Sequence, residues 1–261
     1  MLSNLPKTCI ITVTYNSIRH LAAFLESISV QPCFELVIID NASQDNTREF
    51  LKKWHKIPLK LIFNSKNLGF AMACNQGIQY ALSQEFEYIV LQNPDTLVEA
   101  DWLYYLIESA CHSEKIGLVQ STLVLKDAPH LYNTSGNQMH YLGFGFCGDY
   151  LQPTQSVGDH PIAFASGASL LIKKEVLETI GELNPDFYMY CEDQEWGWRA
   201  RILGYDIVVS TRAIVHHEYD FIKSSLKHYY LERNRWWIVC QYYQAKTLFL
   251  LFPAFLIIEF G

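Results

Sequence analysis

Short apolar runs alternate with segments of helical periodicity along the first half of the chain. The runs are rich in Ile, Val and Leu, and they occupy residues 9–14, 36–40, 59–63 and 88–92. Continuous apolar runs of this kind are typical of strands buried on both faces of a sheet. The intervening segments that can form helices are residues 18–28, 43–54, 71–82 and 99–110. This order predicts an α/β fold with a mostly parallel, Rossmann-like sheet flanked by helices.

The second half of the chain has a less regular pattern. Strands are expected at 168–172 and 206–209, and helices at 175–180 and 193–203, with Gly204 following the last helix. Residues 133–158 are rich in Gly, Asn, Gln and aromatic side chains and have no clear period. A long irregular segment in a compact domain is usually a functional loop or a disordered one, and we expect one of these here.

The C-terminal segment is strongly apolar. Residues 248–260 read LFLLFPAFLIIEF, and aromatic and basic residues precede them. A helix that spans a bilayer needs about 20 apolar residues, and this run is shorter. Aromatic and basic residues beside an apolar helix suit the surface of a membrane. Two interpretations remain open: an apolar helical tail in peripheral contact with a membrane, or a helix packed on the domain.

Composition and charge narrow the class of protein. Of 261 residues, 50% are hydrophobic and 18% are charged, which is enough apolar material for a large core. The formal net charge is −7 and the chain contains no run of Lys and Arg, which argues against a nucleic-acid partner. The seven cysteines are scattered and form no C-x-x-C pair. That usage indicates a reducing cytosol and neither a disulfide framework nor a zinc site.

Polar clusters follow the predicted strands of the first half. They are Thr14-Tyr15-Asn16, Asp40-Asn41, residues 64–69 and residues 93–95. Because the carboxyl ends of parallel strands share one edge of a sheet, we expect these clusters to meet there and to hold a polar ligand. Asp40 could accept hydrogen bonds from a nucleobase or ribose, or could cap the next turn. The chain has neither G-x-G-x-x-G after its first strand nor a P-loop sequence.

Asp95 is the first candidate metal ligand. Pro94 fixes its own φ and disfavours helix at Asn93, so the strand ends there and leaves Asp95 at its carboxyl end. A carboxylate in that position can hold a hard divalent cation, which in turn holds phosphate oxygens. Taken alone, an Asp in such a turn is more often there for local hydrogen bonds.

Three further groups could take part in chemistry. Residues 188–196 place several carboxylates, Asp193 among them, beside aromatic rings, which suits either a general base or the favourable start of a helix. His216 and His217 could complete a metal site begun by Asp95, or could be structural. Arg233 could bind a diphosphate through bidentate contacts, or could belong to a solvated or membrane-facing basic patch.

These motifs, in this order, resemble the family 2 glycosyltransferases of the GT-A fold, in particular their bacterial rhamnosyltransferase-like branch. The matching segments are IITVTYN (10–16), VIIDNASQDNT (37–47), NLGFAMACNQGI (67–78), QNPDT (92–96), FASGASLLIKKEVLETIG (164–181), FYMYCEDQEWGWR (187–199), RAIVHH (212–217) and ERNR (232–235). Each segment alone is a weak signal, whereas the ordered set covers most of residues 8–235.

The resemblance implies an inverting transferase that uses a nucleotide-diphosphate sugar, such as dTDP-rhamnose or a UDP-sugar, with Mg²⁺ or Mn²⁺. By the same resemblance, Asp193 matches the catalytic base. Asp95 and His217 match metal-associated positions, with His216 as the fallback. The residues that match nucleotide-binding positions are Thr14, Tyr15, Asn16, Asp40, Asn67, Asn75 and Arg233. Asn93 departs from the family's Asp-x-Asp element and removes one negative charge from the metal site.

The resemblance also divides the chain. We expect residues 1–235 to form the transferase domain, with a nucleotide-binding half at 1–112 and an acceptor and catalytic half at 113–235. Residues 236–261 would form the apolar segment. The expected acceptor is a saccharide or a lipid-linked sugar of a cell-surface polysaccharide, and the expected location is the cytoplasm, at the inner face of the cell membrane. The competing hypothesis is a non-catalytic nucleotide-sugar-binding or scaffold protein of the same fold.

Overall fold

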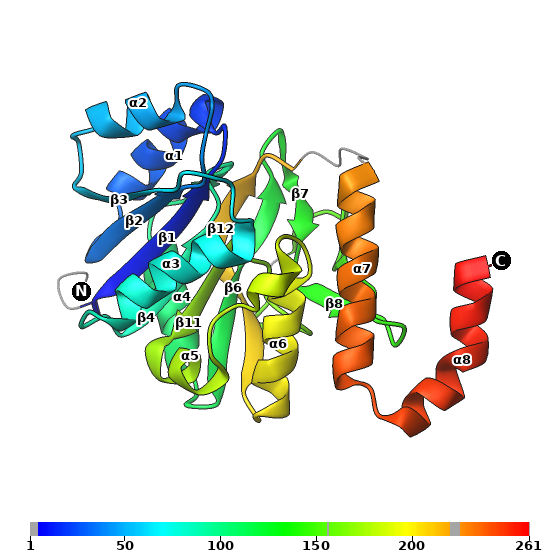
Figure 1. The fold of residues 1–261 in the computed structure, drawn as a ribbon. Helices are drawn as coiled ribbons and strands as arrows, with labels where there is room; N and C mark the ends of the chain where they lie inside the picture. Colours follow the sequence, from blue (N-terminus) through cyan, green and yellow to red (C-terminus); the bar gives the residue numbers. More distant parts are fainter. Residues whose placement is uncertain (1–4, 156, 220–224, 261) are drawn as a thin grey trace.

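The structure, a computed structural model, describes residues 5–155, 157–219 and 225–260 (Figure 1). The elements of the first half are β1 (Thr8–Thr14), α1 (Ile18–Ser29), β2 (Phe34–Asp40), α2 (Thr47–Lys53), β3 (Leu59–Phe63), α3 (Phe70–Leu82), β4 (Tyr88–Gln92), β5 (Thr96–Val98) and α4 (Trp102–Cys111). Those of the second half are β6 (Ile116–Leu125), β7 (Ala128–Thr134), β8 (Asn137–Met139), β9 (Gly145–Cys147), β10 (His160–Pro161), β11 (Ser169–Lys173), α5 (Lys174–Ile180), η2 (Pro185–Phe187), α6 (Glu192–Ile202), β12 (Asp206–His217), α7 (Ser225–Tyr242) and α8 (Ala245–Phe260).

One large sheet forms the centre of the molecule, with strand order β10-β12-β6-β11-β4-β1-β2-β3. Helices cover both of its faces. Successive residues of a strand point to opposite faces, so each central strand contributes side chains to two cores. Ile10 packs into the core that contains Leu21 of α1 and Trp102 of α4. Ile11, the next residue of β1, packs into the opposite core with Trp196 of α6. The alternating β and α elements therefore build a three-layer α/β arrangement.

The predicted parallel sheet is confirmed for the first half of the chain. β1 pairs in parallel with both β2 and β4, and β2 pairs in parallel with β3. The carboxyl ends of β1, β2 and β4 therefore lie at one edge, as the polar clusters after these strands predicted.

The second half corrects three expectations. β11 lies between β4 and β6 and is antiparallel to both, so the centre of the sheet is mixed. β6 is a ten-residue strand that the sequence pattern did not reveal, and residues 133–158 contain the β8–β9 hairpin. β12 continues to His217 instead of ending near Val209, because a register shift between Ser210 and Ile214 lets it pass a polar interruption. The histidine pair thus lies within a strand.

α7 and α8 lie at the end of the molecule opposite α2 (Figure 1). α7 continues through residue 235, so the expected domain boundary falls inside a helix. Phe255 of α8 is buried with Leu142 and Val239, whereas Phe249 is 86% exposed. Within the described residues, no helix has both the length and the hydropathy that a crossing of the bilayer requires.

Candidate active site

The strand edge brings Thr14 and Asp40 together. The two residues are register partners in β1 and β2, and the Thr14 hydroxyl donates to Asp40 Oδ2 over 3.3 Å. Asp40 is fully buried, and its Oδ1 accepts from the Ser43 backbone N–H and from the Arg48 guanidinium. Arg48 compensates the buried charge of Asp40, and the hydrogen bond from Ser43 fixes the loop after β2 to the same carboxylate.

Tyr15 and Asn16 follow β1, and their side chains have different surroundings. The Tyr15 side chain is 47% exposed at the strand edge. Asn16 has a φ of +52°, which Asn tolerates better than most residues. Its Oδ1 accepts from Gln44 N over 2.7 Å, and its backbone N–H donates to Ser43 Oγ over 2.9 Å. Asn16 therefore ties the loop after β1 to the loop after β2, while Tyr15 faces outward.

The side-chain amides of Asn67 and Asn75 both form hydrogen bonds with other residues of the chain. Asn67 Oδ1 accepts from Asn41 Nδ2 at 2.8 Å and from Gly69 N at 2.9 Å. Asn75 is 3% exposed; its Nδ2 donates to Leu183 O over 2.7 Å and its Oδ1 accepts from Leu183 N over 3.0 Å. Asn75 thus clamps α3 to the segment around Leu183, with one hydrogen bond from its Nδ2 and one to its Oδ1.

Asp95 and His217 face each other at the edge beside β4. β5 pairs with the end of β12, and Thr96 is the register partner of His217. That pairing leaves His217 Nε2 3.7 Å from Asp95 Oδ1, which is buried and has no hydrogen-bond partner among the described residues. Although burial alone would raise the pKa of Asp95, a protonated His217 ring that faces the carboxylate lowers it below the ordinary value. The carboxylate is therefore ionised at neutral pH.

The neighbourhood of this pair fits a divalent cation. His217 Nδ1 lies 2.8 Å from Asn133 Oδ1, so an Nδ1–H donated to Asn133 leaves the lone pair of Nε2 directed towards Asp95. Among the described residues no group of three His, Cys, Asp or Glu side chains could hold a metal. A pair of protein ligands suits Mg²⁺ or Mn²⁺ in an active site, since such ions keep several waters and bind substrate phosphates. His216 instead contacts Glu99, with Nε2 2.9 Å from Oε1.

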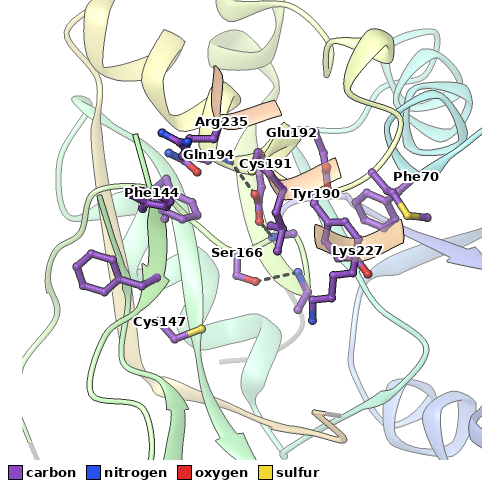
Figure 2. A pocket seen from close by; sticks show the side chains of 18 of the residues that line it. Phe70, Phe144, Cys147, Ser166, Tyr190, Cys191, Glu192, Gln194, Lys227 and Arg235 are labelled. Atoms are coloured by element: carbon purple, nitrogen blue, oxygen red, sulfur yellow. Dashed lines mark hydrogen bonds between the residues drawn. The ribbon is translucent and has the colours of Figure 1, made fainter. Parts of the chain in front are cut away.

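A cavity of about 880 Å³ opens beside this edge, and Asp193 and His217 are among the residues that line it. Figure 2 shows this cavity with Ser166, Glu192 and Lys227 in its wall. Both aromatic and polar side chains line it, including Phe144, Tyr190 and Lys227. Cavities of this size hold one or more sugar rings with room for specific polar contacts.

Asp193 is fixed in the first turn of α6. The Gly167 backbone N–H donates to Asp193 Oδ2 over 2.9 Å, and the Gln194 N–H donates to Oδ1 over 2.7 Å. Burial raises the pKa of Asp193 above its ordinary value, and these backbone donors partly oppose that rise. A carboxylate with raised basicity and a fixed orientation is suited to accept a proton.

Arg233, the predicted diphosphate ligand, contacts backbone carbonyls of the segment that precedes α6. Its Nη2 donates to the carbonyls of Asp186 (2.6 Å) and Phe187 (2.9 Å), and it does not line the cavity. Lys227 and Arg235 are cationic side chains that do line it, and Lys227 Nζ lies 5.6 Å from the centroid of the Tyr190 ring. The sequence pattern did not single out Lys227, because α7 lacks an amphipathic period that would separate its cavity-facing residues.

A family model described as "Glycosyl transferase family 2" matches residues 9–181. Among curated proteins, the poly-beta-1,6-N-acetyl-D-glucosamine synthase of Staphylococcus epidermidis is 26% identical over 230 residues. The match covers 83% of this chain and 52% of that protein, so the chain spans about half the length of this relative.

Two solved structures have the same fold. GalNAc-T7 with UDP, GalNAc and Mn²⁺ superposes with a TM-score of 0.67 at 14% identity, covering 93% of this chain and 49% of that one. Residues 1–349 of S. aureus TarS with UDP-GlcNAc give a TM-score of 0.59 at 18% identity, covering 90% of this chain and 67% of that one. These likenesses confirm the predicted GT-A fold, while the predicted rhamnosyltransferase-like branch stays untested.

Proposed function

This chain belongs to glycosyl transferase family 2, and we propose that it is an inverting glycosyltransferase. It would move a sugar from a nucleotide-diphosphate donor to a hydroxyl group of a saccharide or lipid-linked acceptor during the synthesis of a cell-surface polysaccharide. The single observation that carries this proposal is that Asp193 and His217 line the same cavity. A candidate base and a candidate metal ligand thus share a space large enough for sugar rings.

Asp193 would act as the general base. An acceptor hydroxyl is a poor nucleophile until its proton is removed, and Asp193 would take that proton as the oxygen attacks the anomeric carbon. Each carboxylate oxygen offers about two lone-pair positions. The donors from Gly167 and Gln194 occupy one on each oxygen and fix the plane of the group, which leaves acceptor capacity for the substrate.

Asp95 and His217 would hold the Mg²⁺ or Mn²⁺ ion. The bound cation supplies positive charge that stabilises the leaving diphosphate. Asn133 would keep the His217 ring in the ligating tautomer. Asn93 lines the cavity without a charge, so the diphosphate would meet fewer negative side chains there than beside two aspartates. Lys227 also lines the cavity, and we assign this cation to the diphosphate in place of Arg233.

The nucleoside would lie over the ends of β1 and β2. Tyr15 is exposed there for stacking, and Thr14, Asn16 and Asp40 shape the edge from below. Asn67 orders the adjoining loop. The names of the relatives favour a UDP-linked N-acetylhexosamine as donor, since one is a poly-N-acetylglucosamine synthase and another was solved with UDP-GlcNAc.

We also propose that residues 1–112 bind the nucleotide and that residues 113–235 carry the acceptor side and the base. The segment 236–261 would contact the cytoplasmic face of a membrane. Support for that contact comes from α8, where Phe249, Leu250 and Ile257 are 86%, 76% and 70% exposed. Exposed aromatic and aliphatic side chains of this size favour insertion at a lipid surface.

The test is thermal stability of the purified protein against UDP, GDP, dTDP and their sugars, with Mn²⁺, Mg²⁺ or EDTA. A ligand at about 100 times its Kd stabilises by about 2.7 kcal/mol, which is readily measured. A shift with one nucleotide that EDTA abolishes, followed by single-turnover sugar transfer, supports the transferase. Nucleotide-sugar binding without transfer to any acceptor would favour the scaffold alternative.

A further inference from the structure

Glu192 places a buried carboxyl oxygen at the wall of the cavity, and this oxygen has no partner among the described residues. Its side chain is 6% exposed, and its Oε2 has no hydrogen-bond partner among the described residues. It lines the cavity together with Asp193, and Figure 2 shows it beside Tyr190 and Phe70. A carboxylate buried in this way normally has a cation or several donors, because an isolated buried charge is very costly.

The described residues around Glu192 do not supply that compensation. The negative charge of Asp193 acts on Glu192. Glu192 in turn acts on the Cys74 thiol of α3, the Tyr190 hydroxyl and the Cys191 thiol. All of these are neutral or negative. Burial, with the negative charge of Asp193, raises the pKa of Glu192 to about 8.

Helix α7 brings the remaining charged groups to the cavity. Lys227, Glu232 and Arg235 line it, and His228 lies with them. Arg235 is paired with Glu232 at 2.6 Å and with Glu259 of α8. No ion pair joins Glu192 to any basic side chain in the part of the chain that the structure describes.

We propose that Glu192 is a sugar-binding residue of this site: a neutral carboxylic acid whose O–H donates a hydrogen bond to an oxygen of the sugar bound beside Asp193. The inference rests on the proposed function, since it assigns a second carboxyl group to the same reaction. A neutral acid needs no counter-ion, and its buried oxygen gains a partner only when a ligand enters the cavity. The two adjacent residues then differ in task, because Asp193 accepts a proton while Glu192 donates a hydrogen bond.

The first arm of the test is kinetic. Glu192→Leu removes the donor at similar volume, and we expect about a tenfold loss of kcat/KM, seen mainly in the KM of the sugar substrate that Glu192 contacts. Separate KM values for donor and acceptor identify which sugar that is. Glu192→Gln keeps an N–H donor and should recover most of the loss. Wild-type activity should also decline above about pH 8 as Glu192 ionises, and the Gln variant should lack that decline.

The second arm needs no activity. A carboxyl with a raised pKa in the folded state binds its proton more tightly than the unfolded chain does, so stability falls as pH rises from about 4.5 to about 8. We therefore expect the melting temperature of Glu192→Gln, relative to wild type, to increase between pH 5 and pH 8.5. Glu178→Gln, an exposed carboxyl on α5, is the matched control and should show a constant difference.

Each outcome decides a separate point. A pH-independent difference in melting temperature for Glu192→Gln would overturn the assignment of a neutral Glu192. Unchanged KM values in Glu192→Leu would overturn its contact with sugar. Absence of transfer by the wild-type protein would count against the proposed function, while the stability arm would still decide the protonation state.

Discussion

His217 Nε2 lies 3.7 Å from Asp95 Oδ1, while Nδ1 of the same ring lies 2.8 Å from Asn133 Oδ1. This separation is too long for a hydrogen bond, and the carboxylate oxygen has no other partner in the described part of the chain. With Asn133 as the acceptor for Nδ1–H, two lone-pair donors face each other across the gap. That arrangement is the one a divalent cation stabilises.

Asp95→Ala and His217→Ala should each remove the part of the nucleotide-induced melting shift that depends on Mn²⁺. The reason is that each variant deletes one of two protein ligands, while the nucleoside contacts remain. His216→Ala is the control, since His216 contacts Glu99 instead. An equal loss with EDTA present and absent would show that Asp95 does not bind a metal.

Asn133→Ala should weaken Mn²⁺ affinity by about 10–100-fold, although Asn133 is not itself a proposed ligand of the ion. The reason is that the His217 ring loses the acceptor that fixes its tautomer. Titration of the melting shift with Mn²⁺ at saturating nucleotide measures this directly. Unchanged Mn²⁺ dependence would leave Asn133 with a packing role alone.

Asp193→Asn should lower kcat by about 10²–10⁴, the usual contribution of a general base. The amide keeps the size of the side chain, so donor binding and the melting shift with nucleotide should persist. Single-turnover transfer with the bound donor isolates the chemical step. A variant as active as wild type would exclude Asp193 as the base.

The acid side of the pH profile should report Asp193. Its pKa is raised by burial, so the base is protonated, and kcat/KM falls, at a higher pH than an ordinary aspartate would give. Measurement of kcat/KM from pH 4.5 to 7.5 tests this. An acid limb that falls at the pH of an ordinary aspartate would contradict a base of raised pKa.

Asn75→Ala should destabilise the fold by about 1–3 kcal/mol and leave donor affinity unchanged. Both backbone groups of Leu183 lose their partner in this variant. Denaturant unfolding measures the change in stability. The control is Gln79→Ala, because Gln79 lies on the same helix as Asn75 and makes an exposed hydrogen bond to Glu182. A lower donor affinity with unchanged stability would instead support nucleotide binding by Asn75.

The sequence alone predicted β1 to β4 and the helices between them, whereas β5 was not foreseen. Periodicity reports burial, and buried apolar strands separated by helices have few arrangements other than a parallel sheet with right-handed crossovers. The residues at the ends of β1, β2 and β4 therefore had to meet at one edge. The resemblance added candidate roles for Asp95, Asp193 and His217, and the structure places Asp193 and His217 around one cavity.

Only the tertiary structure decided how strands and polar groups pair across long separations in the chain. The antiparallel position of β11, the passage of β12 to His217 and the place of Asn133 behind that ring depend on contacts between distant segments. The same holds for Arg233, whose guanidinium binds carbonyls 46 and 47 residues away. Local sequence specifies whether a side chain is buried or exposed, whereas its partner is chosen by packing, and the isolation of Glu192 becomes visible only when every neighbour is in place.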